Sequence, residues 1–147
     1  MRAGFSLIEV IVVTAILGIL SILGISNFTA TIERSRDARR KADLSTIQKG
    51  LESYYGDNSV YPATITTADL CASTTTCYLK TVPTDPSGGS NVYYYVRGNT
   101  GGTSQSYQLY STLERTDDTG TGVNQGGYAG TCGGTCKYGV SSSNVTP

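Results

Sequence analysis

The sequence contains no histidine and no tryptophan, and its 11 basic residues are balanced by 11 acidic ones. Without histidine the chain cannot form a histidine-based catalytic triad, a cysteine–histidine nucleophile pair or a metal site with histidine ligands. The balanced charge indicates no polyanionic or acidic partner. Neither a P-loop nor a GxGxxG run is present, so the chain has no recognisable nucleotide-binding motif. We therefore expect no enzyme, no catalytic residue, no cofactor and no bound metal.

Charged residues are also nearly missing from one long stretch, residues 5–28, in which Glu9 is the single charged side chain. As a helix this stretch would span about 36 Å, enough to cross the roughly 30 Å hydrocarbon core of a bilayer. Residues 1–4 precede it, and no small-residue cleavage site follows it, as one would in an ordinary secretory signal. We therefore expect a segment that remains in the protein and crosses a membrane.

Helix-breaking residues stay rare beyond the apolar stretch. Residues 29–55 contain no proline and one glycine, Gly50. Apolar and aromatic residues recur there at helical spacing with charged residues between them, namely Leu44, Ile47, Leu51, Tyr54 and Tyr55. The sequence Gly-Asp-Asn at 56–58 is a stop signal. We predict one helix over residues 5–55, apolar in its first half and amphipathic in its second, and about 75 Å long.

The remaining residues, 56–147, carry the signals of strands and loops. Residues 91–97 and 106–113 are rich in tyrosine and β-branched residues, and the second segment alternates with period two. Turn-forming residues at 98–102 separate the two segments. This pattern predicts two antiparallel strands joined by a turn.

The last part of the chain is dominated by glycine, serine and threonine from Asp117 onward, which predicts a loop with one short strand near residues 136–140. In the earlier strand, Tyr107 or Leu109 and their alternates should face the amphipathic part of the helix. The predicted fold class is therefore α+β, a long N-terminal helix packed against a two- or three-stranded antiparallel sheet.

The four cysteines fall in two close pairs, Cys71 with Cys77 and Cys132 with Cys136. An even number in a Gly/Ser/Thr-rich region beyond a membrane segment favours disulfides in an oxidising compartment. Zinc is the alternative, because the second pair has a spacing that zinc ligands use. Four cysteines allow three connectivities, and proximity favours pairing within each couple.

Glu9 is the most informative single residue, because a carboxylate inside a membrane span is costly and usually marks function. A simpler interpretation places it near the headgroups, where the helix dipole favours a negative charge. The residues around it argue for function. They read Gly4-Phe5-Ser6-Leu7-Ile8-Glu9.

This segment resembles the leader junction of the type IV pilins and type II secretion pseudopilins. The resemblance implies that a prepilin peptidase cuts after Gly4 and methylates the new N-terminus at Phe5. Glu9 would then neutralise the Phe5 amine of a neighbouring subunit and set the assembly register, since a buried ion pair is costly to break. The implied organisation is a leader (1–4), a transmembrane and filament-core half-helix (5–28), an amphipathic half-helix (29–55) and a head (56–147).

The resemblance continues to about residue 115, through the end of the long helix and through Val82-Pro83-Thr84-Asp85-Pro86, which is similar to the approach to the sheet in G-type pseudopilins. Two departures stand out. Many members have a proline late in the apolar half, where this chain has Ser26. The secretion pseudopilins also close a calcium site near their C-terminus. Glu114, Asp117 and Asp118 are candidate oxygen ligands here, but they do not make a convincing set, and solvated loop acids are the favoured interpretation.

A basic cluster follows the apolar stretch and consists of Arg34, Arg36, Arg39, Arg40 and Lys41. Such a cluster could contact phosphates of DNA. However, Glu33, Asp37 and Asp43 alternate with it at helical spacing, which suits pairing along the helix and contacts between subunits. We therefore favour a solvated or subunit-packing face and do not expect nucleic acid as a partner.

The expected function is that of a structural subunit of a type IV pilus-like filament, a helical homo-oligomer whose core is the bundled apolar helices. The alternative is a type II secretion or DNA-uptake pseudopilin that forms a short periplasmic pseudopilus. The low-charge C-terminal part favours the pilus, and a membrane-tethered enzyme is the weakest hypothesis. Expected partners are the inner membrane, a prepilin peptidase, and the assembly platform with its ATPase, because the chain has no nucleotide motif of its own. The precursor would lie in the inner membrane, and the product would be an extracellular filament or a periplasmic pseudopilus.

Overall fold

The computed structural model describes residues 4–66, 68–73, 75–98 and 104–147, without the side chains of residues 23–27. It consists of two compact units, Met1–Ser35 and Arg36–Pro147, which are described separately below. The turn predicted at 98–102 therefore lies outside the described residues from residue 99 onward. The Ser26 side chain, at the position of the expected proline, lies outside them too. Residues 1–3 of the predicted leader lie outside them as well.

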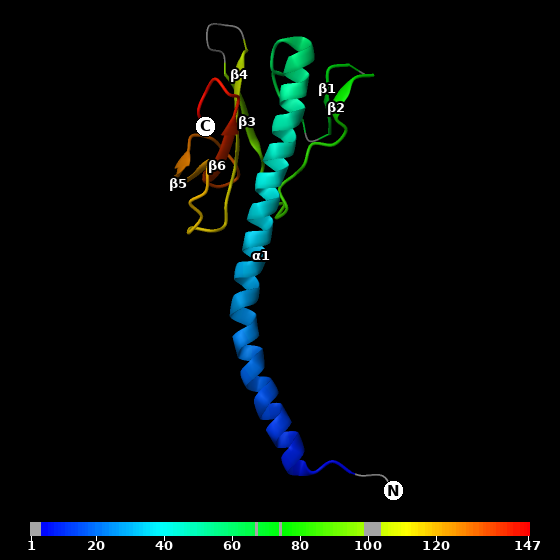
Figure 1. Ribbon diagram of the computed structural model, residues 1–147, viewed down its shortest axis with the longest axis vertical. Coiled ribbons are helices and arrows are strands. Elements are labelled where there is room, and N and C mark those ends of the chain that lie inside the picture. Colours follow the sequence, from blue (N-terminus) through cyan, green and yellow to red (C-terminus); the bar gives the residue numbers. More distant parts are fainter. Residues whose placement is uncertain (1–3, 67, 74, 99–103) are drawn as a thin grey trace. The chain divides into compact units, whose positions relative to one another are not determined.

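Helix α1 comprises Leu7–Asn58 and confirms the prediction of a single long helix (Figure 1). It begins after Ser6, whose carbonyl accepts the amide hydrogens of Glu9 and Val10 at 3.1 and 3.3 Å. It ends at Asn58, and the next residue, Ser59, has a φ of 59°. The Ser59 amide donates to the Tyr55 carbonyl at 2.7 Å, a left-handed C-terminal cap. The helix therefore continues past the predicted end at residue 55, through the Gly-Asp-Asn sequence that was expected to stop it.

Among the residues whose side chains the structure describes, we find no helix with the length and hydropathy needed to cross a membrane. The membrane-spanning segment predicted over residues 5–28 includes 23–27, whose side chains lie outside that set.

The head contains a four-stranded antiparallel sheet with the order β3-β4-β6-β5 (Figure 1). Its strands are β3 (Tyr94–Gly98), β4 (Ser106–Ser111), β5 (Val123–Tyr128) and β6 (Cys136–Ser141). A separate two-stranded hairpin is formed by β1 (Leu70–Cys71) and β2 (Cys77–Leu79). The α+β class and the strands predicted near 91–97, 106–113 and 136–140 are confirmed.

The prediction of a two- or three-stranded sheet was wrong, because β5 is a further strand in the region expected to form a loop. Two of its six residues are glycine, which is depleted in strands, so propensity gave no signal for it. The strand is also irregular: its register with β6 shifts between Val123 and Tyr128, and Gly127 has a φ of 91°. It forms because β6 offers an edge with which its backbone can pair.

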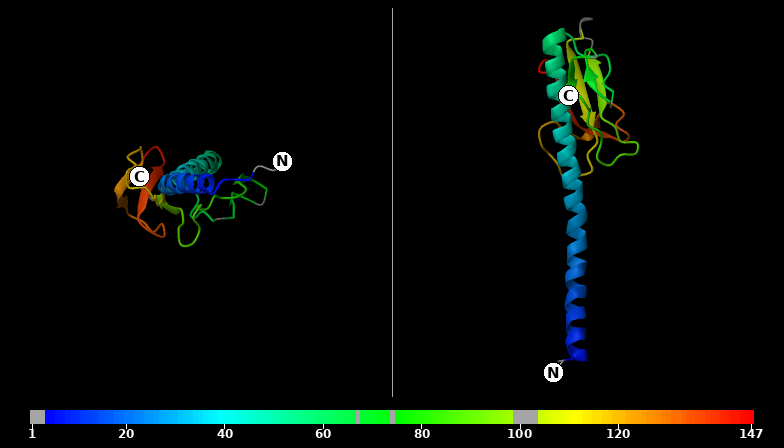
Figure 2. Two further views of the ribbon diagram at one scale, coloured as in Figure 1. Left: turned by 90° about the horizontal axis from the view of Figure 1, so that it is seen from below. Right: turned by 90° about the vertical axis from the view of Figure 1, so that its right-hand side faces the viewer.

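The main core lies between the second half of α1 and one face of the sheet (Figure 2). Leu44, Ile47 and Leu51 from α1 are all fully buried, and so are Tyr107 and Leu109 from β4. The expectation that Tyr107 or Leu109 faces the helix is thus confirmed for both residues. Residues two positions apart on a strand lie on the same face of the sheet, so Tyr107 and Leu109 identify the face of β4 that packs against the helix.

The opposite face of the sheet has a smaller core around a disulfide. Cys132 and Cys136 are joined with a Cα–Cα distance of 5.5 Å, and both are fully buried against Tyr110. Gly133 lies inside this short loop with a φ of 81°, and a Cβ there would collide with the Ser90 carbonyl. The loop therefore needs glycine at this position in order to pack on the segment before β3.

The second disulfide joins Cys71 to Cys77 across the β1–β2 hairpin, with a Cα–Cα distance of 3.9 Å. In the structure each cysteine therefore pairs with its near neighbour in sequence. Because both couples are oxidised, their sulfurs are not thiolates, and the alternative of a cysteine zinc site is not supported.

Candidate functional site

The predicted cleavage junction lies immediately before α1. Gly4 and Phe5 are exposed and precede the first helical residue, and the Phe5 residue is 84% exposed. Among the described residues, no atom lies within 4 Å of a Cβ placed on Gly4. A peptide bond outside regular structure and free of packing is the kind that a peptidase can reach.

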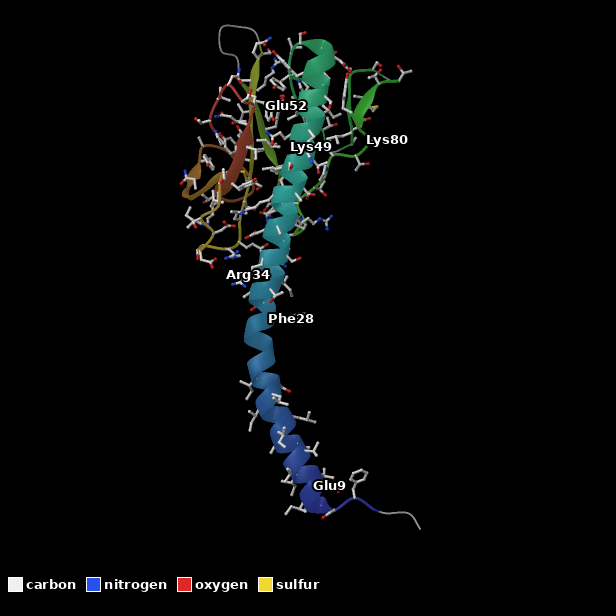
Figure 3. The ribbon with its side chains drawn as sticks, in the orientation of Figure 1. Glu9, Phe28, Arg34, Lys49, Glu52 and Lys80 are labelled. Carbon is white, nitrogen blue, oxygen red and sulfur yellow. A yellow bond between two sulfur atoms is a disulfide. The ribbon has the colours of Figure 1, made fainter. Side chains whose placement is uncertain are left out.

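Glu9 lies in the first turn of α1, and Figure 3 shows it at the start of the helix. Its carboxylate is exposed and lies near the helix N-terminus, where the unpaired amide groups favour a negative charge. The Phe5, Glu9 and Val13 side chains, with Val10 and Thr14, line a shallow apolar recess. The structure therefore brings Phe5 and Glu9 to one side of the helix start, next to apolar surface.

The first turns of α1 expose apolar side chains all around the helix. Those at least 49% exposed are Leu7, Ile8, Val10, Ile11, Val12, Val13, Ile16, Leu17, Ile19, Leu20 and Ile22. Thr14 and Ser21 satisfy their hydroxyl groups internally by donating to the carbonyls of Val10 and Leu17, at 3.0 and 2.7 Å. A helix that is apolar on every face requires a lipid or protein environment around it. This half of α1 is the candidate site of membrane insertion and assembly.

A buried ion network lies in the head where α1 meets the loops. The Arg40 side chain is completely buried, and its guanidinium donates to Asp85 through Nε at 2.7 Å and through Nη2 at 3.0 Å. Its Nη1 donates to Asp37 at 2.7 Å and to Glu114 at 2.8 Å, and its Nη2 also donates to Ser87 at 2.7 Å. One arginine thus connects the helix with two loops that are distant in sequence.

The backbone completes this network. The Asp37 carboxylate accepts the amide hydrogens of Glu114 and Arg115, both at 3.0 Å, and the Asp85 carboxylate accepts that of Ser87 at 2.9 Å. Every buried carboxylate oxygen of Asp37 and Asp85 therefore has a donor. A buried charge is tolerated when it is paired and hydrogen-bonded in this way.

The ionisation of the network follows from these contacts. Burial lowers the pKa of Arg40, but its hydrogen bonds to Asp85, Glu114 and Asp37 outweigh burial and raise the pKa above its ordinary value. Hydrogen bonds from Arg36 and Arg40 lower the pKa of Glu114 to about 2. Burial raises the pKa of Asp85, yet the bonds from Arg40 and Ser87 lower it overall. All three groups are therefore charged near neutral pH.

This network corrects the interpretation of the basic cluster as a solvated or subunit-packing face. Arg40 is buried in the head, and Arg36 pairs with Glu114. Arg34 and Arg39 do remain exposed, and Arg39 pairs with Asp43 one turn away at 4.0 Å. The sequence contained a signal for the buried members. Asp37 and Arg40 continue the spacing of the buried stripe formed by Leu44, Ile47 and Leu51.

The three candidate calcium ligands do not fit a metal ion. Glu114 is bound by Arg36 and Arg40, Asp117 by Arg115 at 2.9 and 2.8 Å, and Asp118 by Lys41 at 2.6 Å. A calcium ion needs six to eight oxygen ligands that are not neutralised by a cation of the protein. The interpretation of solvated loop acids holds for Asp117, whose side chain is 66% exposed, but not for Glu114 and Asp118, which are 25% and 13% exposed and held in ion pairs of the head.

Together, a glycine–aromatic–glutamate junction, a long helix that is apolar in its first half, and an antiparallel sheet packed on its second half define a pilin-like protein. Residues 1–25 match the family described as the prokaryotic N-terminal methylation motif. Residues 27–126 match the type II secretion system (T2SS) protein G family. The chain belongs to the type II secretion system protein G family.

Named relatives agree with this assignment. The chain is 30% identical to the type II secretion system core protein G of Vibrio cholerae over 137 residues, which cover 86% of this chain and 92% of the relative. It is 32% identical to that of Pseudomonas aeruginosa over 74% of this chain and 82% of the relative. A fimbrial protein of Eikenella corrodens, EcpC, is 32% identical over 68% of this chain and 65% of the relative. No solved structure matches the chain.

Proposed function

We propose that the protein is a structural subunit of a type II secretion pseudopilus, polymerised through the first half of α1 after cleavage behind Gly4. The observation that carries the proposal is the ring of exposed apolar side chains over Leu7 to Ile22, with Glu9 as its one charge. The protein G family match supports the pseudopilus over the pilus that the Gly/Ser/Thr-rich region favoured. Similarity to a fimbrial protein keeps a pilus subunit as the second candidate.

In the proposed mechanism the precursor resides in the inner membrane with its apolar half-helix among lipid chains. Assembly exchanges lipid for the same helices of other copies, so the apolar surface remains covered throughout. Cleavage creates an amine at Phe5, and the Glu9 carboxylate of a neighbour neutralises it in a low-dielectric bundle. Removing one partner of such a pair costs about 3–5 kcal/mol, which is enough to fix the register between subunits.

The head supports assembly by remaining fixed to the helix residues that it covers. The Arg40 network and the Leu44–Leu109 core hold residues 36–58 of α1 against the sheet. The ion pairs and the core of the head stabilise the fold, and we assign the subunit no catalytic role.

A prepilin peptidase would process and methylate the subunit, and a secretion platform with its ATPase would supply the work. The product would be a periplasmic pseudopilus.

The proposal can be tested by expressing the chain with a reconstituted type II secretion assembly platform and, separately, with a type IV pilus platform. Sheared polymer is detected by electron microscopy and immunoblotting. We expect polymer with the secretion platform, and its loss in Glu9→Gln. The control variant Glu33→Gln lies on the same helix beyond the apolar half and should still polymerise. Polymer formed with the pilus platform alone would favour the fimbrial candidate, and no polymer with either would contradict both.

A further inference from the structure

A lysine from α1, Lys41, forms an ion pair with the loop between β4 and β5. The Lys41 Nζ lies 2.6 Å from the Asp118 Oδ2, and the other oxygen of Asp118 accepts the Gly120 amide hydrogen at 3.0 Å. The two side chains are 30% and 13% exposed. A Cβ placed on Gly120 would lie 3.5 Å from the Lys41 Nζ, so the ammonium is seated inside the turn.

A β6 residue contacts the same ammonium. The Lys41 Nζ lies 5.4 Å from the centre of the Tyr138 ring, within the range of a cation–π interaction. Lys41 therefore contacts both the β4–β5 loop and the strand that pairs with β5. Its bond is also the largest cause of the lowered pKa of Asp118, so the carboxylate stays charged at neutral pH.

Two main-chain oxygens of the loop also accept hydrogen bonds from a side chain of the head. The Gln125 Nε2 donates to the Asp118 carbonyl at 2.8 Å and to the Arg115 carbonyl at 3.3 Å. These two carbonyls and the carboxylates of Glu114, Asp117 and Asp118 are among the oxygens that the loop could offer to a cation. Each of them already accepts a hydrogen bond from an amide, a guanidinium or an ammonium group.

We propose that the Lys41 ammonium, together with the Gln125 amide, closes the β4–β5 loop in place of a divalent cation, so that the head folds and remains stable without calcium. A calcium ion at Asp118 would have to displace an ammonium held at 2.6 Å and would remain close to its charge. It would also need oxygen ligands that Gln125 now holds. The loop departs in this respect from the calcium site that its family resemblance implies. The proposal concerns the head alone and does not depend on which filament the subunit enters.

The test uses the full chain purified in detergent, with thermal unfolding followed by the near-ultraviolet circular dichroism of its tyrosines. Unfolding is measured in excess EDTA and in millimolar calcium chloride for the wild type and two variants. Lys41→Met removes the ammonium and keeps the aliphatic stem. Lys49→Met is the matched control, because Lys49 is an exposed lysine two turns further along α1 (Figure 3).

We expect the wild-type midpoint to differ by no more than about 1 °C between EDTA and calcium, and Lys41→Met to lower the midpoint by about 3–6 °C. Lys49→Met should leave it within about 1 °C. Lys41→Arg keeps the positive charge and should recover part of the lost stability in EDTA.

A calcium-dependent rise of several degrees in the wild-type midpoint would overturn the proposal. Equal midpoints for Lys41→Met and Lys49→Met would overturn it too. The wild-type comparison remains decisive even if Lys41→Met does not fold.

Discussion

The Arg40 guanidinium binds the Asp85 carboxylate with both oxygens engaged, at 2.7 and 3.0 Å, although the two residues are 45 positions apart. The exposed fraction of the Arg40 side chain is 0% and that of Asp85 is 1%. A two-point arginine–carboxylate contact fixes orientation as well as distance. This pair therefore sets how the loop before β3 meets α1.

Removing Arg40 should be one of the most destabilising single changes in the head. Arg40→Met would leave Asp37, Asp85 and Glu114 close together without their shared cation, which should cost about 3–5 kcal/mol of unfolding free energy. The measurement is urea denaturation of the full chain in detergent. Arg39→Met is the matched control, because the Arg39 side chain is 68% exposed, and it should cost less than about 1 kcal/mol. Equal losses would mean that the network contributes no stability.

Acid should weaken the head through the same carboxylates. The pKa of Glu114 falls from an ordinary 4.5 to about 2, and that of Asp85 is also lowered in the folded state. A lowered folded-state pKa stabilises the fold above the unfolded pKa, and this contribution disappears as the pH falls through the folded value. We therefore expect the urea midpoint to decline between about pH 5 and pH 2. Glu114→Gln should be less stable at neutral pH and should show a shallower decline. An unchanged slope in this variant would contradict the role assigned to Glu114.

Two helical glycines should respond to alanine in opposite directions. Gly50 is buried, and a Cβ there would lie 2.7 Å from the Leu79 Cγ in β2. Gly50→Ala should therefore push the β1–β2 hairpin away and cost about 1–3 kcal/mol. Among the described residues, no atom lies within 4 Å of a Cβ on Gly56. Gly56→Ala should stabilise α1 by up to about 1 kcal/mol, because alanine has the higher helix propensity. Thermal unfolding of both variants decides this, and a stabilised Gly50→Ala would contradict the close approach.

The two disulfides should differ in their rate of reduction. Cys132 and Cys136 are fully buried, whereas Cys77 is exposed and Cys71 is partly exposed. Thiol–disulfide exchange requires that the attacking thiolate reach a sulfur atom. Under native conditions with a mild reductant, alkylation followed by peptide mass spectrometry should label Cys71 and Cys77 first. In urea the two couples should become similar, which controls for differences in intrinsic reactivity. Earlier labelling of Cys132 and Cys136 in the native protein would contradict their burial.

Elements with a strong local pattern were predictable from the sequence. The apolar run and the spacing of Leu44, Ile47 and Leu51 predicted one helix and the face that it buries, because a 3.6-residue period is a local property. The alternation around Tyr107 and Leu109 likewise predicted β4 and its inner face. The junction around Glu9 led to the correct family.

Features that depend on distant partners were not predictable in the same way. Strand β5 pairs with β6 despite its glycines, and no local preference reveals such an edge. Gly50 is explained by Leu79, which the hairpin brings onto the helix. The partners of Arg40 are up to 74 positions away, so the sequence showed a basic cluster where the fold contains an ion network. Helical spacing could place Asp37 and Arg40 on the buried stripe, but it gives no information on which distant side chains they meet there.

The most direct measurement is the intact mass and N-terminal sequence of subunits recovered from sheared polymer, after expression with a prepilin peptidase and the secretion platform. We expect chains that lack residues 1–4 and carry one added methyl group on Phe5, and we expect Gly4→Ala to block this processing and leave no polymer. Polymer made of chains that retain residues 1–4, or processed chains that never leave the monomeric state, would contradict assembly through a cleaved N-terminal helix.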